Sequence, residues 1–522
     1  MIEVEVHNSL RAFLRSAGEP HWPHHLTMAR LVARALRLGR SALMQVGVYG
    51  GSARYRLSYL TPALIWPAPV ILVAPESVQQ RLLTVEIPQL RQWIQTSKPI
   101  RMGDDALDPN FQGLLLVTPQ AWLQDRLTGE NRFGIGIPTI LDGVDDLEDW
   151  ARNQLTACIQ PKDWEQLMLA CPERASQIRD ARVQLTKAIF QHPPNPYECC
   201  LLETPEQDIL KRLYEHLGNA PKPAAPEETT EIDKAVGLVD NVPDAWKIFW
   251  RRFQTEGQLN WAEIARPIGQ FSLFAGPVEV ASALSKIWHQ QPVVLIGGAL
   301  DLEAEAPLYR SRLGLGNLTS VKFSPDRNSE LIKLYLPDGL PMPNTPQFQS
   351  CLLQEFRKLM AATASVGGLV VVLVSDVPLK AQVAASLAAE FGSRVQVEKT
   401  CLDENGILVT GWQFWRQYQG VMPAPIAIAI ATLPIPSLEN PLVAGRVAYY
   451  KQQRLDWFRL YLLPEALSAL PHALAPVRES SGLVALFDSR AIHRSYGTLV
   501  LAALSPFARL NYLDPSLLSG DR

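Results

Sequence analysis

Residues 41–67 read SALMQVGVYGGSARYRLSYLTPALIWP, and this stretch decides the fold. It combines an apolar strand, a glycine-bearing loop and an apolar helix that opens near Ser58, which is the outline of a nucleotide-binding first turn. A working phosphate loop ends in Gly-Lys-Ser/Thr, whose lysine reaches the β- and γ-phosphates and whose hydroxyl holds Mg²⁺. Here no lysine precedes Lys98, and the two positions fall near Tyr55 and Arg56. The stretch therefore predicts the fold of a nucleotide-binding domain without its chemistry.

The degenerate loop still contains residues that could contact a phosphate. We take Gly50, Gly51, Arg54, Tyr55 and Arg56 as its candidate nucleotide-binding residues. One hypothesis is that Arg54 and Arg56 replace the missing lysine, because guanidinium groups bind phosphate well. The alternative is that both arginines are surface charges on a loop that has lost its function.

Composition limits the class of protein. A length of 522 residues predicts two or three domains, and 47% hydrophobic with 19% charged residues is typical of a soluble globular chain. The net charge of −3 produces no global attraction to nucleic acid. We see no secretory signal and no apolar run long enough to span a membrane. Six cysteines do not suggest a disulfide framework, so we expect a cytoplasmic protein with no membrane partner.

Short apolar runs recur along the chain, and helical patterns separate many of them. Fully apolar strands that alternate with helices predict an α/β fold with parallel sheets covered on both faces. The runs form one group before residue 142 and a second group after residue 292, which predicts two lobes. They are Val70–Val73, Leu114–Val117, Thr139–Leu141, Val293–Ile296, Val370–Val374, Ile407–Val409, Ile426–Ala431 and Leu483–Phe487.

The region between the two groups has a different pattern. Residues 145–265 show no strand-like runs, so we predict a helical insertion there, with a flexible Pro/Ala/Glu-rich loop near 218–234. The first lobe would then consist of residues 1–144 and 266–300. Residues 301–522 would form the second lobe.

Several further motifs occur in a familiar order. The chain resembles the DinG/XPD branch of superfamily 2 ATP-dependent DNA helicases over about 450 residues. The resemblance implies two RecA-like lobes of the P-loop NTPase type, the second corresponding to a helicase C-terminal domain. The motifs that carry it are VILVAPESVQQRLL (70–83), LLLVTPQAWLQDRL (114–127), TILDGVDDL (139–147), PVVLIGGAL (292–300), Ser324–Pro325, Phe414–Trp415, Leu433–Pro436 with Pro441–Leu442, and Asp488, Arg490, Tyr496 and Gly497.

The resemblance also assigns catalytic positions. The Mg²⁺-side aspartate of the acidic box is Asp142, but the following position, a glutamate in the family, is Gly143. The arginine motif of the second lobe falls on PHALAPVR (471–478), where only Arg478 survives. The retained catalytic candidates are therefore Asp142 and Arg478. An arginine finger alone contributes about 10³–10⁵ in rate, so several such losses together predict little hydrolysis.

Cofactors follow from the same positions. ATP and Mg²⁺ are expected only if the degenerate site still binds them, and a single carboxylate without phosphates is a poor Mg²⁺ site. Many members of this helicase branch hold an iron–sulfur cluster before the acidic box, but residues 75–139 contain no cysteine. We therefore expect no iron–sulfur cluster and no other metal.

Two features suggest nucleic-acid contacts. Arg30, Arg34 and Arg37 share one face of a predicted amphipathic helix over residues 27–40, and an arginine stripe suits phosphate groups. Trp415 lies at a loop where it could stack on a base. The alternatives are a solvated helix face for the arginines and core packing for the tryptophan.

Three hypotheses follow for the whole chain. The first is a non-catalytic pseudo-helicase that binds single-stranded DNA, another nucleic acid or a protein partner. The second is a divergent but active ATP-dependent DNA helicase. The third is a protein-interaction scaffold that has lost both ATP and nucleic acid.

Overall fold

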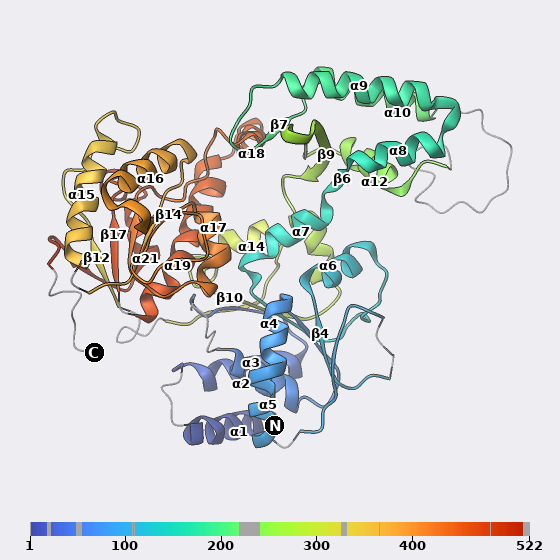
Figure 1. The fold of residues 1–522 in the computed structure, drawn as a ribbon. Coiled ribbons are helices and arrows are strands. Elements are labelled where there is room, and N and C mark those ends of the chain that lie inside the picture. Colours follow the sequence, from blue (N-terminus) through green and yellow to red (C-terminus); the bar gives the residue numbers. More distant parts are fainter. Residues whose placement is uncertain are drawn as a thin grey trace. The chain divides into compact units, whose positions relative to one another are not determined.

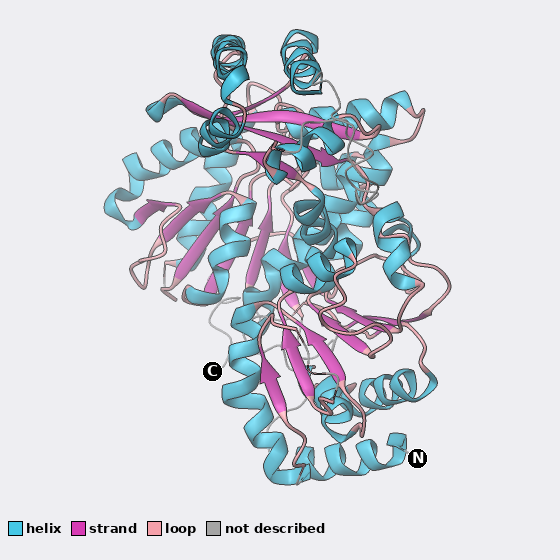
Figure 2. Ribbon diagram, turned by 90° about the vertical axis from the view of Figure 1, so that its right-hand side faces the viewer, coloured by secondary structure: helices cyan, strands magenta, loops and turns pink. Residues whose placement is uncertain are grey.

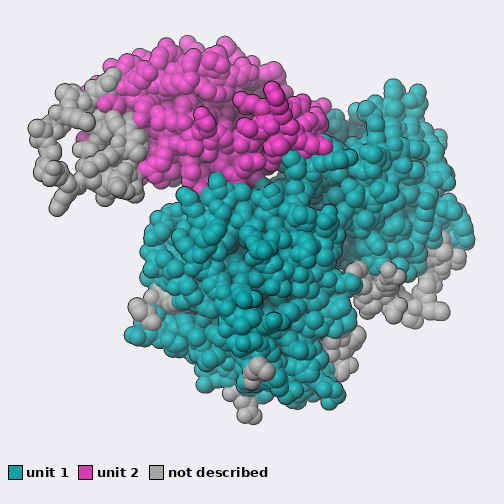
Figure 3. All heavy atoms as spheres, turned by 180° about the vertical axis from the view of Figure 1, so that it is seen from behind, with its two compact units in different colours: residues 1–148, 281–436, 458–522 teal, residues 149–280, 437–457 magenta. Residues whose placement is uncertain are grey.

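The computed structural model describes residues 2–17, 22–48, 55–94, 96–106, 108, 110–218, 241–324, 331–364, 366–480 and 482–514. The described chain forms two compact units, coloured separately in Figure 3. One unit contains Met1–Glu148, Ala281–Pro436 and Phe458–Arg522, and the other contains Asp149–Val280 and Ser437–Trp457. Most of the flexible loop predicted near 218–234 lies outside the described residues.

The first unit contains two parallel sheets of seven strands each. The first sheet has the order β11-β1-β10-β5-β2-β4-β3, and its five central strands are buried throughout because apolar side chains fill both faces. The strands are β1 (Ala42–Gln45), β2 (Val70–Val73), β3 (Ile100–Met102), β4 (Leu114–Val117), β5 (Thr139–Asp142), β10 (Val293–Gly297) and β11 (Thr319–Lys322).

Helices cover this sheet, and a group of them lies near the N-terminus of the chain in Figure 1. Helices α1, α2, α3 and α5 pack against one another around a shared apolar core. The helices of this part are α1 (Ile2–Ala17), α2 (His25–Leu38), α3 (Arg56–Ile65), α4 (Glu76–Arg81), α5 (Ile87–Ile94), α6 (Pro119–Thr128), α13 (Ala281–Trp288) and α14 (Pro307–Arg312).

The second sheet has the order β14-β15-β13-β16-β17-β12-β18, and Figure 2 shows helices on both sides of its strands. Successive residues of β13 enter two different core clusters, one on each face of the sheet. The strands are β12 (Ile332–Tyr335), β13 (Leu369–Leu373), β14 (Val395–Val397), β15 (Ile407–Thr410), β16 (Pro425–Ile430), β17 (Leu483–Leu486) and β18 (Phe507–Leu510). The helices are α15 (Phe348–Thr363), α16 (Val377–Phe391), α17 (Trp412–Tyr418), α19 (Leu463–Glu479), α20 (Arg490–His493) and α21 (Gly497–Leu504).

The second unit corrects the expectation of an insertion without strands. It contains a four-stranded antiparallel sheet of order β6-β9-β8-β7 beside its helices. Strands β8 and β9 mix buried and half-exposed residues, so they lack the continuous apolar runs that revealed the parallel strands. The elements are α7 (Leu147–Leu155), which crosses the boundary, β6 (Ala157–Ile159), α8 (Pro161–Ala170), α9 (Ala175–Gln191), β7 (Cys199–Leu201), α10 (Thr204–Gly218), α12 (Asp244–Phe253), β8 (Gln258–Ala265), β9 (Gln270–Pro277) and α18 (Pro441–Gln452).

Two predicted boundaries also change. Strand β11 pairs with β1, so the first sheet includes residues that we assigned to the second lobe beyond residue 300. Its sequence TSVK is partly polar because β11 is an edge strand, and it gave no apolar run. Residues 437–457, also assigned to the second lobe, group with the insertion. Within the described part of the chain, no helix is both long enough and apolar enough to cross a membrane.

Candidate functional site

The candidate site is centred on Asp142, the last residue of β5 in the middle of the first sheet. The carboxyl ends of neighbouring parallel strands meet at this edge, where open α/β sheets bind their ligands. Helix α3 follows the loop after β1. Tyr55 is the residue immediately before the helix, and Arg56 and Tyr59 lie in its first turn. Tyr55 and Tyr59 are four residues apart, so they lie on one face of the helix.

All three side chains from α3 bind the Asp142 carboxylate. The Tyr55 hydroxyl donates to Oδ1 at 2.7 Å, and the Tyr59 hydroxyl donates to Oδ2 at 2.8 Å. The Arg56 guanidinium donates through Nε to Oδ2 at 3.1 Å. The side chain of Asp142 is only 1% exposed and that of Arg56 is 12% exposed. The carboxylate is therefore satisfied by its own chain and is shielded from water.

The electrostatics of this cluster keep the two tyrosines protonated and Arg56 charged. Burial raises the pKa of Tyr55 and of Tyr59 well above the usual value, and the Asp142 carboxylate raises them further, so both remain proton donors. Burial alone would lower the pKa of Arg56, but the Asp142 carboxylate outweighs it and raises this pKa above its normal range. Arg56 therefore stays charged. It is neither a surface charge nor directed to solvent.

Asp145 is the second buried carboxylate of the acidic box. Gly143 adopts a left-handed conformation with φ of 81°, which turns the chain sharply after β5 and aims Asp145 at β10. The backbone amides of Gly298 and Ala299 donate to Asp145 at 2.8 and 2.7 Å. The His472 ring, from α19, donates through Nε2 to Oδ1 at 3.0 Å.

These partners keep Asp145 ionised. Burial alone would raise the pKa of Asp145, but the His472 ring and the two backbone amides lower it well below the usual value. The other acidic residues near this edge are likewise paired with basic side chains. Asp146 pairs with Arg416 of α17, and Arg312 of α14 pairs with both Glu148 and Glu465. The acidic box is thus bound to basic side chains of the same unit.

The other catalytic candidate, Arg478, does not face this site. It lies near the end of α19, is buried, and donates to the backbone carbonyls of Leu504, Ser505 and Pro506. Its role as a surviving arginine finger is therefore wrong for this structure. In the sequence, a lone arginine in a helix gives no indication of which way its side chain turns.

Replacing Arg478 with methionine should reduce stability without changing ligand binding. The change removes the guanidinium donor from three carbonyl groups, of which Pro506 keeps the backbone amide of Ile332 as a donor. We expect a cost of about 2–4 kcal/mol in the free energy of unfolding. Urea denaturation of the variant and of the wild type measures this loss. A variant as stable as the wild type would contradict the structural role of Arg478.

Trp415 is also not where a base could reach it. Its ring is fully buried in the core of the second lobe, and its indole N–H donates to the carbonyl of Ala473 at 2.8 Å. The core-packing alternative is therefore correct. The aromatic side chains that line a pocket on this helix are Phe414 and Tyr418, one residue before and three after Trp415.

The arginine stripe does form on α2. Arg30 and Arg34 are exposed, and neither has an ion-pair partner among the residues that the structure describes. Arg37 instead pairs with Glu3 of α1 at 2.7 Å. Three of the predicted loop residues lie outside the described residues: Gly50, Gly51 and Arg54.

Comparison with known proteins supports the helicase resemblance. Over 255 residues the chain is 23% identical to the ATP-dependent DNA helicase YoaA of Escherichia coli K12, which covers 46% of this chain and 40% of that protein. The structure of S. tokodaii Xpd4 matches 94% of this chain and 100% of its own, with a TM-score of 0.58 and 13% identity. A solved XPD helicase gives a TM-score of 0.57 at 10% identity, again over 94% and 100% of the two chains. No family model matches.

The predicted fold class is thereby confirmed. The chain is similar in sequence to a DNA helicase and in fold to the XPD helicases, and its two parallel sheets are the cores of two RecA-like lobes. The chain spans about two fifths of the length of the curated relative that it matches. Likeness of fold does not transfer activity, which depends on the residues at the site.

Proposed function

We propose that this chain is a non-catalytic helicase-fold protein that binds single-stranded nucleic acid. The observation that carries the proposal is the Asp142 carboxylate, whose two oxygens already accept three hydrogen bonds from Tyr55, Tyr59 and Arg56. In an active enzyme of this type the corresponding aspartate holds Mg²⁺ beside the phosphates. Here Tyr55 and Arg56, at the lysine and hydroxyl positions of the loop, form hydrogen bonds with that aspartate instead.

Hydrolysis has further obstacles at the same edge. The position that should orient the attacking water is Gly143, which has no side chain. Asp145 already accepts hydrogen bonds from His472 and two backbone amides, so a ligand would have to break these contacts to bind the carboxylate. An arginine finger alone is worth about 10³–10⁵ in rate, and Arg478 is turned into the second lobe. The combined losses support a protein that does not turn over ATP.

Nucleic acid is the partner class that the remaining features favour. A related protein is described as a DNA helicase, and this chain retains the two-lobe fold. Arg30 and Arg34 are exposed on α2 and have no ion-pair partner within the described part of the chain, so their guanidinium groups are available for phosphate contacts. A protein-interaction scaffold without nucleic-acid affinity is the rival outcome of the experiments below.

The test is ATP binding and hydrolysis by the purified protein, with and without single-stranded DNA. We expect no DNA-stimulated hydrolysis and no saturable ATP binding at millimolar ATP. Hydrolysis that appears with DNA and disappears in an Asp142→Asn variant would establish a divergent active helicase instead. That substitution keeps the shape of the side chain, so circular dichroism can confirm that the variant is folded.

A double variant Arg30→Ala, Arg34→Ala should weaken binding of single-stranded DNA at low salt. Each lost phosphate contact reduces the slope of log affinity against log salt by about 1. Fluorescence anisotropy over a salt series measures the slope. Arg37→Ala is the matched control, because that guanidinium is already paired with Glu3. Equal slopes for the double variant and the wild type would remove these arginines from the interface.

A further inference from the structure

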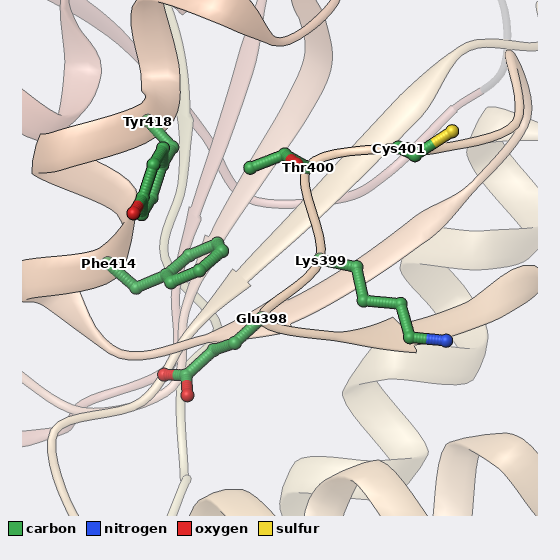
Figure 4. A pocket seen from close by; sticks show the side chains of 6 residues that line it. All are labelled: Glu398, Lys399, Thr400, Cys401, Phe414 and Tyr418. Carbon is green, nitrogen blue, oxygen red and sulfur yellow. The ribbon is translucent and has the colours of Figure 1, made fainter.

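The second lobe has a pocket that the acidic-box site does not use. It has a volume of about 420 Å³, within the range of small-molecule sites. Six residues line it, from the segment that follows β14 and from α17, as Figure 4 shows: Glu398, Lys399, Thr400, Cys401, Phe414 and Tyr418.

Two aromatic rings form one wall of the pocket. Phe414 and Tyr418 are four residues apart on α17, and their ring centroids lie 4.7 Å apart at an angle of 46°. Both side chains are half-buried. The Thr400 side chain points toward these rings, whereas Lys399 points away from them (Figure 4). The wall thus offers aromatic surface opposite a small side chain that can form a hydrogen bond.

A fixed carboxylate lies at the lower edge of the pocket in Figure 4. Glu398 has a φ of 46°, a conformation that non-glycine residues rarely adopt and that often marks a functional position. Its Oε1 accepts hydrogen bonds from the Lys380 ammonium group at 2.6 Å and from the backbone amide of Gly411 at 3.1 Å. Among the described residues no bond reaches Oε2, so this oxygen can still accept a donor from a ligand.

The charges distinguish between two kinds of ligand. Aromatic rings beside a carboxylate could hold a cation, but Lys380 already neutralises Glu398 and Lys399 lies next to it. These three side chains carry a net charge of +1, from two ammonium groups and one carboxylate. A cationic ligand is therefore disfavoured. A neutral planar ring that stacks on the aromatic wall and donates an N–H to Glu398 is favoured, particularly one that carries a phosphate.

We infer that this pocket receives one base of a single-stranded nucleic acid, stacked on Phe414 and Tyr418. The inference rests on the proposed function and adds a base subsite to it. Adenine and cytosine carry an exocyclic amino group that can donate to Glu398. The corresponding donor of thymine is its N3–H, which lies between two carbonyl oxygens that a carboxylate repels. Stacking of a base on an aromatic side chain tolerates every base, so Glu398 supplies the preference.

The experiment compares short oligomers of dA, dC and dT, and a dA oligomer containing abasic sites, by fluorescence anisotropy. Phe414→Leu and Tyr418→Leu keep an apolar side chain in the lobe but remove a ring. We expect each to weaken dA and dC binding about tenfold without changing the salt slope, because no phosphate contact is lost. Tyr418→Phe should bind like the wild type. Tyr512→Leu, which removes an exposed ring elsewhere, is the matched control.

The outcomes distinguish a failure of the proposed base subsite from a failure of the proposed nucleic-acid binding. If the wild type binds oligomers and both leucine variants bind them equally well, the subsite is wrong while nucleic-acid binding stands. If the wild type binds abasic and intact dA equally, base stacking is likewise excluded. If the wild type binds no oligomer at low salt, the proposed function itself fails. Equal affinity for dA and dT would overturn the role of Glu398.

Discussion

Replacing Asp142 with alanine is expected to destabilise the protein by about 3–5 kcal/mol, the usual cost of leaving a buried charge without its partner. The variant leaves the Arg56 guanidinium without its carboxylate partner, although that side chain is only 12% exposed. It also removes the acceptor of two buried tyrosine hydroxyls. Urea denaturation followed by circular dichroism measures the loss. In an active helicase the same aspartate acts on Mg²⁺ and phosphate, so the main effect of its removal would be on hydrolysis rather than on folding.

Two milder variants test whether the loss comes from this cluster. Tyr59→Phe removes one hydrogen bond and keeps the ring, so it should cost about 1 kcal/mol. Asp142→Asn keeps an acceptor oxygen but no charge, so its loss of stability should lie between those of Tyr59→Phe and Asp142→Ala. If Asp142→Ala unfolds at the same urea concentration as the wild type, the ion pair with Arg56 does not contribute to stability, and the carboxylate remains available to a ligand.

The sequence predicted much of the framework because parallel strands buried on both faces appear as continuous apolar runs. Strands β2, β4, β10 and β13 were found in this way. The antiparallel strands β8 and β9 were missed for the converse reason, since their half-exposed residues interrupt the apolar pattern.

The site was only partly predictable. The missing lysine and glutamate could be read directly, because chemistry requires those residue types at fixed positions. The partners of Asp142 could not be predicted, because a tyrosine four residues after Tyr55 resembles any buried residue of an amphipathic helix. The spacing of Tyr55, Arg56 and Tyr59 was the available signal, since all three lie at the start of the helix that follows the predicted phosphate loop. Arg478 and Trp415 were misplaced because motif position does not specify side-chain direction.

The pairing of Asp145 with His472 links the acidic box to α19 of the second lobe. Of the described residues, Gly298, Ala299 and His472 supply all the hydrogen bonds to this carboxylate. Two of these donors are backbone amides of the first lobe, and the third is the His472 side chain. The carboxylate therefore joins the two lobes by direct contacts.

Replacing Asp145 with alanine should lower the free energy of unfolding by about 3 kcal/mol, because two half-buried amides and the His472 ring lose a charged acceptor. His472→Ala should cost less, since the amides keep their partner. A double-mutant cycle should give a coupling of about 0.5–3 kcal/mol between the two side chains. Denaturant unfolding of the four proteins measures it. A coupling near zero would show that the His472 contact does not hold the lobes together.

The pH dependence gives an independent check on the same carboxylate. The pKa of Asp145 is lowered in the folded protein, so below about pH 4 the unfolded state binds the proton first. The stability that Asp145 contributes is therefore fully present above that pH and is lost as the pH falls further. The difference in stability between the wild type and Asp145→Ala should shrink in acid, whereas the difference for Arg478→Met should not follow this carboxylate. A constant difference for Asp145→Ala would mean that its cost arises from packing, and that the two lobes are held together by other contacts.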